Sequence, residues 1–195
     1  MTKKERIQAA SRGEKPDKMP YSFWTHMPGT DLDPEAISQK TYEFYKKYDF
    51  DFVKTMNNGM YAIEDFGCTV DYSEIVKGGV AKVVSTPISC AADWRKLTVC
   101  PCTQGSNARE LRHLQLVLEK LKGEEVPVIF TAFTPITIAD KISGGKLISY
   151  IEEGHGDDVK AALEVLTETT AQLVAAAIDM GDDGIFLASQ MRSYA

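Results

Sequence analysis

The fold is decided by residues 157–188, which read DDVKAALEVLTETTAQLVAAAIDMGDDGIFLA. The first part of this stretch repeats apolar residues at the 3.6-residue period of an amphipathic helix, and Gly181 is typical of a helix end. The period is carried by Val159, Leu163, Leu166, Leu173, Val174, Ala177 and Ile178. The continuous apolar run 184–188 predicts a strand buried on both faces, as in a parallel sheet covered by helices.

The same alternation of helix and strand extends back to the N-terminus. Further strands are predicted over residues 18–24, 50–56 and 126–133, and further helices over 2–11, 33–47 and 106–122. Strands separated by helical segments indicate (βα) repeats around a parallel sheet. Four such strands in 195 residues leave two α/β architectures open. One is a four-stranded open domain, and the other is the front half of an eight-stranded barrel, which usually takes about 250 residues.

Two local signals refine this prediction. Asp33 followed by Pro34 is an N-cap with proline at the first helical position, which starts the helix over 33–47. The pair Gly78-Gly79 lies between the β-prone segments 74–77 and 80–86 and predicts a small β-hairpin insertion.

Composition bounds the class of protein. With 44% apolar and 26% charged residues, the chain resembles an average globular protein and is expected to form a single domain over residues 1–195. A net charge of -6 favours neither nucleic acid nor anionic membrane as a partner. The longest strongly apolar stretch, 126–133, is too short to span a bilayer, and the charged N-terminus lacks a signal-peptide core, so a cytoplasmic location is expected.

Polar residues follow three of the predicted strands. His26 follows the first strand, whereas Asn57, Asn58 and Tyr61 follow the second, and Ser189 with Gln190 follows the last. Parallel barrels place their chemistry at these strand ends, so the residues could line one pocket for a small-molecule substrate. Alternatively, they are loop residues that satisfy turn backbone groups, as asparagine before glycine often does.

A metal site within the chain is not expected. Of the three histidines, His113 and His155 fall in a predicted helix and turn, where both read as structural. The pair Cys100 and Cys102 is weak evidence for zinc without further ligands, and free thiols are the simpler interpretation.

Four segments carry a resemblance to a known family. They read RGEKPDKMP at 12–20, YDFDFVK at 48–54, FTPITIA at 133–139 and GDDGIF at 181–186. In this order they resemble the uroporphyrinogen decarboxylase family, including its branch of corrinoid-dependent methyltransferases. The resemblance implies a TIM-type (β/α) barrel, of which this chain holds only the N-terminal half.

The resemblance also directs attention to particular positions. In the decarboxylases, two arginines after the first strand hold substrate propionates, an aspartate follows the second strand and a tyrosine follows the third. Here the segment 23–29 contains His26 but no arginine, the aspartate position falls on Asn58, and the tyrosine position falls near Lys141. Asn58 and His26 are therefore the catalytic candidates, and the substrate-binding candidates are Asn57, Tyr61, Lys141, Ser189 and Gln190.

These departures bear on the activity. Decarboxylation of a pyrrole proceeds through a cationic intermediate, which a carboxylate stabilises and a neutral Asn58 does not. We therefore expect a decarboxylase-like lyase with a substrate other than uroporphyrinogen, and no turnover of uroporphyrinogen by this chain alone. One alternative is a methyltransferase-like protein, for which the resemblance implies zinc and a corrinoid in a full-length form and no cofactor within this chain. Another is a non-catalytic half-barrel that associates with a second copy or with a missing C-terminal half.

Overall fold

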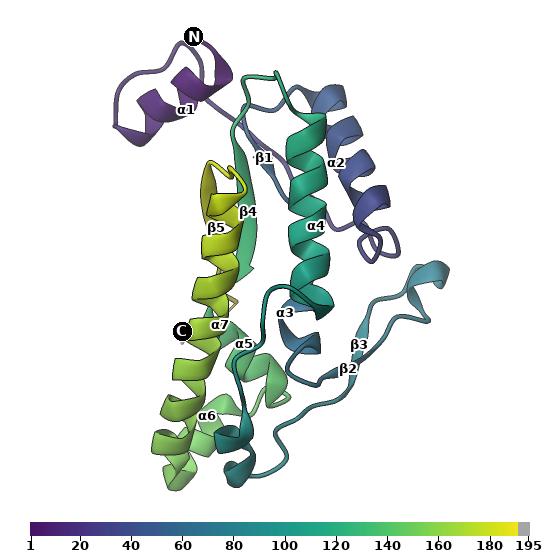
Figure 1. Ribbon diagram of the computed structural model, residues 1–195, viewed down its shortest axis with the longest axis vertical. Helices are drawn as coiled ribbons and strands as arrows, with labels where there is room; N and C mark the ends of the chain where they lie inside the picture. Colours follow the sequence, from purple (N-terminus) through teal and green to yellow (C-terminus); the bar gives the residue numbers. More distant parts are fainter. Residues whose placement is uncertain (191–195) are drawn as a thin grey trace. The chain divides into compact units, whose positions relative to one another are not determined.

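The computed structural model describes residues 1–190 (Figure 1). Contacts divide the chain into two compact units. The first comprises Met1–Asn58, Arg109–Thr131 and Ala175–Phe186, and the second comprises Gly59–Ala108, Ala132–Val174 and the described residues from Leu187 onward.

A three-stranded sheet has the order β1-β4-β5, with β1 at Val53–Lys54, β4 at Val128–Phe133 and β5 at Gly184–Ala188. β1 pairs with β4 in parallel. The amide of Asp183 donates to the Val128 carbonyl at 2.8 Å, and the amide of Thr134 donates to the Ala188 carbonyl at 3.0 Å. Because the starts and the ends of β4 and β5 meet in this way, these two strands are also parallel. The predicted α/β class with a parallel sheet in sequence order is confirmed.

The predicted strand over residues 18–24 is wrong, since the structure assigns no strand there. The segment lies beside β1 in extended form, but its one backbone bond to this region runs from the Asp51 amide to the Tyr21 carbonyl at 2.9 Å. Pro16 and Pro20 lack an N–H group and so interrupt any ladder. The sheet of the described residues therefore has three strands instead of the four expected.

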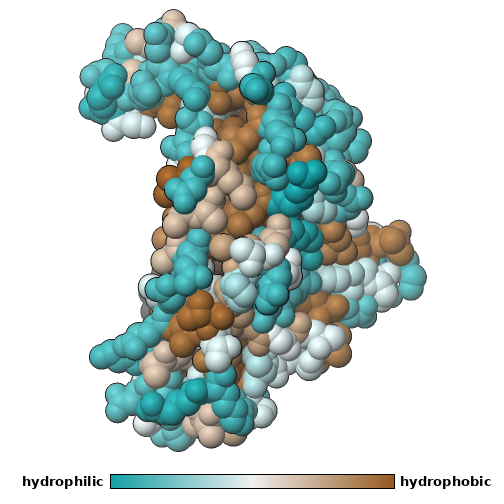
Figure 2. Space-filling view, in the orientation of Figure 1, coloured by the Kyte–Doolittle hydropathy of each residue, from teal (hydrophilic) through white to brown (hydrophobic). Residues whose placement is uncertain are grey.

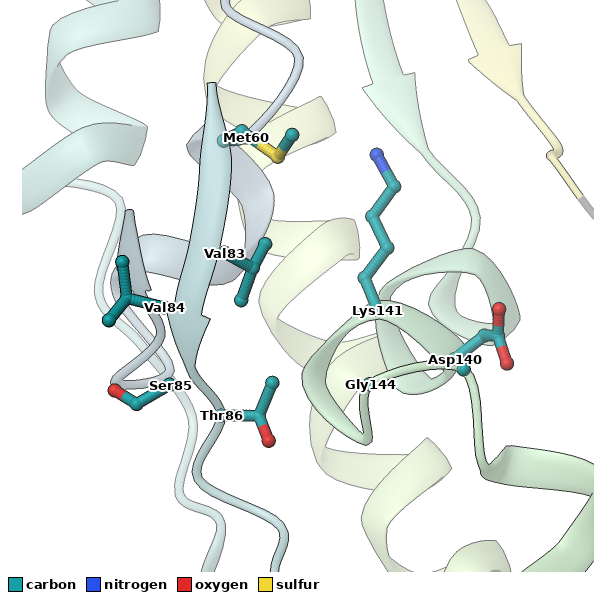
Figure 3. A pocket seen from close by; sticks show the side chains of 9 residues that line it. Met60, Val83, Val84, Ser85, Thr86, Asp140, Lys141 and Gly144 are labelled. Atoms are coloured by element: carbon teal, nitrogen blue, oxygen red, sulfur yellow. The ribbon is translucent and has the colours of Figure 1, made fainter. Parts of the chain in front are cut away.

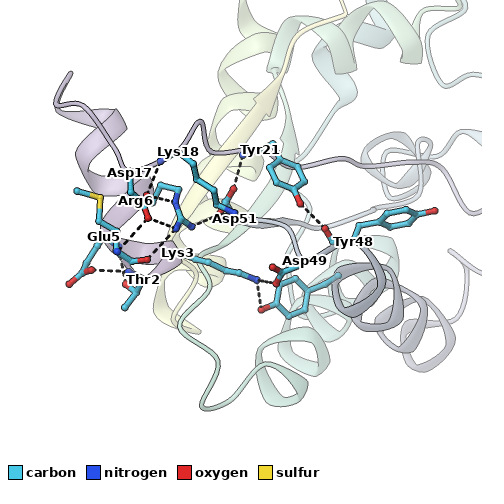
Figure 4. Close-up of polar contacts among 12 residues, drawn as sticks. Thr2, Lys3, Glu5, Arg6, Asp17, Lys18, Tyr21, Tyr48, Asp49 and Asp51 are labelled. Atoms are coloured by element: carbon cyan, nitrogen blue, oxygen red, sulfur yellow. Dashed lines mark hydrogen bonds and ion pairs between the residues drawn. The ribbon is translucent and has the colours of Figure 1, made fainter.

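An ion cluster holds this segment in the first unit (Figure 4). Arg6, on α1 (Lys3–Ser11), bonds Asp17 at 2.7 Å and the fully buried Asp51 at 2.5 Å. Asp51 also accepts the Tyr21 amide at 3.0 Å. The cluster thus fixes the chain leading to Trp24 against the start of β1.

Two long helices lie side by side in the first unit (Figure 1). The first is α2 (Pro34–Tyr48), where Asp33 caps the N-terminus as predicted, and the second is α4 (Gly105–Lys120), of which the residues from Arg109 belong to this unit. The core of this unit includes Ile37 and Tyr45 of α2, Leu114 and Val117 of α4, and Phe130 of β4.

In the second unit, the hairpin pairs β2 (Thr69–Asp71) with β3 (Lys82–Ser85). The prediction that residues 74–77 form its first strand is wrong, because Ile75–Lys77 makes a 3-10 turn that Gly78 ends in the left-handed conformation. Val76 and Val80 are exposed near the end of the hairpin, where Figure 2 shows hydrophobic surface in brown.

The remaining elements of the chain are short α3 (Tyr61–Glu64), η2 (Ala91–Lys96), α5 (Pro135–Ile142), α6 (Leu147–Tyr150), η3 (Ile151–His155) and the long α7 (Gly156–Asp179). Gly154, at φ 91°, separates α7 from the preceding turns. By length and composition, the helical segment Leu147–Asp179 is long and apolar enough to cross a membrane. The search for uninterrupted apolar stretches in the sequence did not select this segment. The core helix of a globular protein passes the same test, and α7 does bury Val159, Ala162, Leu166 and Leu173.

Candidate functional site

Lys54 is the central feature of the candidate site, and it lies in the first unit on strand β1. Its side chain is buried, with the residue 7% exposed. The ammonium lies 4.3 Å from the centroid of the Trp24 ring and 4.7 Å from that of Phe186. Within residues 1–190, no carboxylate and no hydrogen-bond acceptor contacts it. Burial without a compensating anion lowers the pKa of Lys54 to about 8.

The position of Lys54 follows from the sheet. Lys54 pairs with Ile129 of β4, and a Cβ on Gly184 of β5 would approach the Ile129 side chain at 3.4 Å. Because side chains alternate along a strand, Phe186 projects to the same face as Gly184. Lys54 and Phe186 therefore share one face of the sheet, and the extended segment that Arg6 anchors brings Trp24 to it.

His26, a predicted catalytic residue, is exposed and packs edge-on against Trp24, with ring centroids 5.3 Å apart. Trp24 is thus in contact with both His26 and the Lys54 ammonium. Trp24 and Phe186 are 50% and 41% exposed, so the rings that shield the amine also face solvent.

Asn58, the other predicted catalytic residue, is buried and hydrogen-bonds the side chain of Asp31. Burial raises the pKa of Asp31, while the Asn58 hydrogen bond and the charge of Arg109 oppose the rise. Sequence reasoning missed Asp31, which places a buried carboxyl beside Asn58, the asparagine expected from the resemblance at the family's aspartate position. Its Oδ1 atom has no hydrogen-bond partner among the described residues.

Asn57 is fixed by a small polar network at the end of β1. The Thr55 hydroxyl donates to Asn57 Oδ1 at 2.5 Å, and Thr131 on β4 donates its amide to Thr55 Oγ1 at 3.0 Å. With Oδ1 occupied, the amide nitrogen Nδ2 of Asn57 is buried and has no acceptor in residues 1–190. Buried polar atoms of this kind usually bind a ligand or an ordered water.

The four other predicted site residues belong to the second unit. Lys141 on α5 donates to the Gly59 carbonyl at 3.1 Å and lies over the Phe133 ring, and burial lowers its pKa. Tyr61 is fully buried, with its ring centroid 5.7 Å from that of Phe133. Ser189 and Gln190 are exposed, and the Gln190 amide donates to Thr137 Oγ1 at 3.0 Å.

A pocket of about 360 Å³ in this unit borders Lys141 (Figure 3). It is lined by Met60, Val83, Val84, Ser85, Thr86, Asp140, Lys141, Gly144 and Gly145. Tyr61, Ser189 and Gln190 are not among its lining residues. That all the predicted residues line one pocket stays a prediction.

Cys100, one of the two cysteines weighed as zinc ligands, is hydrogen-bonded in the described chain. The Cys100 thiol donates to the Asp65 carbonyl at 3.3 Å, and burial raises its pKa to about 11, so it is protonated at neutral pH. A zinc ligand is a thiolate. No group of three or more His, Cys, Asp or Glu side chains among residues 1–190 is arranged to hold a metal ion.

Comparisons with known proteins agree with the fold. No curated protein sequence matches the chain. A solved methyltransferase from Methanosarcina mazei superposes with a TM-score of 0.77 at 20% sequence identity, over 96% of this chain and 58% of that one. The chain therefore spans little more than half the length of this structural relative. The family model described as Uroporphyrinogen decarboxylase (URO-D) matches residues 2–193, and the chain belongs to this family.

Proposed function

We propose that the chain is the N-terminal part of a URO-D-family (β/α) barrel enzyme that acts on a small carboxylate-bearing substrate other than uroporphyrinogen. The observation that carries this proposal is the buried Lys54 ammonium, which no anion of residues 1–190 contacts. Burying an unpaired charge costs free energy, so natural proteins keep one mainly where a ligand or a reaction uses it.

The surroundings of Lys54 favour a small substrate. A single cation suits one carboxylate. The rings of Trp24 and Phe186, which contact the amine, offer apolar surface to the rest of a small substrate. Recognition of several propionates would call for the planar, bidentate guanidinium of arginine, and residues 23–29 contain none. Asn58 is neutral, so it cannot stabilise a cationic pyrrole as a carboxylate does.

The half-barrel architecture is part of the same proposal. The sheet has β1 and β5 at its two edges, and both would be extended by further strands in a complete barrel. The chain covers 58% of the similar methyltransferase, which supports an origin in a longer barrel.

The methyltransferase alternative is supported by that likeness, which at 20% identity is a likeness of fold. In that case we expect zinc to be held by residues outside 1–190, because no group of three or more His, Cys, Asp or Glu side chains within this range is arranged to hold a metal. Metal analysis of a longer version of the protein separates the two proposals, since stoichiometric zinc would favour the methyltransferase.

Binding and turnover test the leading proposal. In calorimetric titrations, succinate should bind the chain, and its uncharged analogue succinamide should not. Lys54→Gln should weaken succinate binding at least about tenfold, the equivalent of about 1.4 kcal/mol. Lys122→Gln changes an exposed lysine and should have no effect. Equal binding by the Lys54→Gln chain, or coproporphyrinogen formed from uroporphyrinogen above a boiled control, would overturn the proposal.

A further inference from the structure

We propose that the amine of Lys54 forms an imine with a carbonyl carbon of the substrate, which makes the substrate class a 3-oxo carboxylate and the reaction a decarboxylation. This inference rests on the proposed function and names the substrate class of the same site. It assigns Lys54 a covalent role in place of a purely ionic one.

The geometry around the Lys54 amine favours a nucleophilic role. Lys54 Nζ lies over two aromatic rings, at 4.3 Å and 4.7 Å, on a strand that is held by pairing with β4. Lys54 is only 7% exposed, and this burial favours both the neutral amine and the loss of water that completes an imine. A carboxylate partner would hold the amine in its charged form, and residues 1–190 provide none at Lys54.

Lys141 differs from Lys54 in the hydrogen bonding of its amine. It is partly buried and lies over an aromatic ring, that of Phe133 at 4.6 Å. Its Nζ atom, however, donates to the Gly59 carbonyl at 3.1 Å, which engages the amine in a structural hydrogen bond. Lys54 has no such acceptor, so it is the better nucleophile of the two.

The fraction of reactive amine supports the geometry. With a pKa of about 8, about a quarter of Lys54 is neutral at pH 7.5, whereas about one in a thousand unperturbed lysines is. Desolvation of a lysine in an apolar pocket is an established route to a nucleophilic amine.

The chemistry balances without an oxidant or a metal. The neutral amine adds to the ketone carbon, and loss of water gives the imine, which is protonated on nitrogen. The bond between the carboxylate and the adjacent carbon then breaks, carbon dioxide leaves, and the electron pair moves to the iminium nitrogen as an enamine forms. A proton adds to the enamine carbon, and water hydrolyses the resulting imine to release the ketone and restore the amine.

This assignment also accounts for the neutral residue at the family's aspartate position. Decarboxylation needs a group that accepts the electron pair of the broken bond. The protonated imine on Lys54 would be that group, so a carboxylate at Asn58 would not be needed to stabilise a cationic ring.

Reductive trapping tests the inference. The chain is incubated with acetoacetate and cyanoborohydride at pH 7.5, digested, and mapped by mass spectrometry. We expect a propan-2-yl group on Lys54, formed after carbon dioxide has left, and labelling should be blocked by succinate. Carbon dioxide should be released faster than by a Lys54→Arg chain, which keeps the charge but not the nucleophile. Lys122→Arg should behave as the parent chain does.

Acetone, the product of uncatalysed decay, is run in parallel at the same concentration. Labelling of Lys54 by acetone as fast as by acetoacetate, or an adduct that retains the carboxylate, would overturn the decarboxylation. Equal labelling of all exposed lysines with Lys54 unmodified would overturn the imine. Since succinate blocking is measured on the parent chain, these results do not depend on the folding of a variant. If the imine is overturned but succinate binding still depends on Lys54, the proposed function stands. If succinate binding does not depend on Lys54, both the imine and the proposed function are overturned.

Discussion

Replacing Lys54 by methionine should make the folded chain more stable at pH 7, although it removes the residue on which the proposed site depends. Burial lowers the pKa of Lys54 from 10.5 to about 8. A pKa change of one corresponds to about 1.4 kcal/mol of free energy between the charged and the neutral amine. The charged amine therefore costs the folded state about 3 kcal/mol at most. Its contacts with the two rings return about 1 kcal/mol each. The net gain from Lys54→Met is about 1 kcal/mol, or about 2–4 °C in the melting temperature.

The pH dependence of this gain has a defined sign. Because the pKa of Lys54 is lower in the folded than in the unfolded chain, the unfolded chain binds more protons between pH 8 and 10.5. The stability of the parent chain should therefore rise over this window relative to that of the Lys54→Met chain. The advantage of the variant is fully present below pH 8 and shrinks above it.

Urea unfolding followed by circular dichroism at several pH values measures both effects. Lys122→Met is the matched control, and it should change the free energy of unfolding by no more than about 0.5 kcal/mol because Lys122 is exposed. A loss of more than about 1 kcal/mol in the Lys54→Met chain at pH 7 would contradict this prediction. It would mean that the ammonium is satisfied in the folded chain.

Three further predictions concern the scaffold around the site. Asp51→Asn breaks a buried ion pair with Arg6 and should lower the free energy of unfolding by about 3 kcal/mol, as measured by urea unfolding. In the same assay, Asp49→Asn should cost less than about 1 kcal/mol, because Asp49 is exposed. Gly105→Ala should cost about 2 kcal/mol in the same assay, because Gly105 has a φ of 66° and the new Cβ would lie 2.1 Å from Oδ1 of Asp65. The control Gly123→Ala places its Cβ where no atom lies within 4 Å, and it should cost about half as much. The exposed Trp24 and Phe186 should make the chain self-associate at micromolar concentration, as sedimentation across a dilution series would show; a monomer with one cooperative thermal transition would contradict this.

The regular elements with strong local signals were predictable from the sequence. The Asp33-Pro34 cap started α2 where expected, and the apolar runs near 130 and 187 formed β4 and β5. Residues 18–24 have the aromatic composition of a strand, but the nearby prolines leave too few amide donors for a ladder.

The candidate site was only partly predictable. The rule that function gathers at strand ends selected Asn57 and Asn58, both of which are buried with polar partners, Thr55 for Asn57 and Asp31 for Asn58. Lys54 was missed because a lysine within the run 52–56 reads as part of a strand, although one basic residue among apolar neighbours is itself a signal. Asp31 was missed because its hydrogen bond to Asn58 joins two residues that are distant in sequence.

The role of Lys54 is tested most directly by an NMR titration of its side-chain nitrogen in the chain labelled with ¹⁵N-lysine, with Lys54→Arg to assign the signal. We expect a midpoint near pH 8 in the free chain and a higher midpoint when succinate is bound, because a bound carboxylate favours the charged amine. A midpoint near 10.5 that succinate leaves unchanged would contradict it, since Lys54 would then be an ordinary solvated lysine with no role in a site.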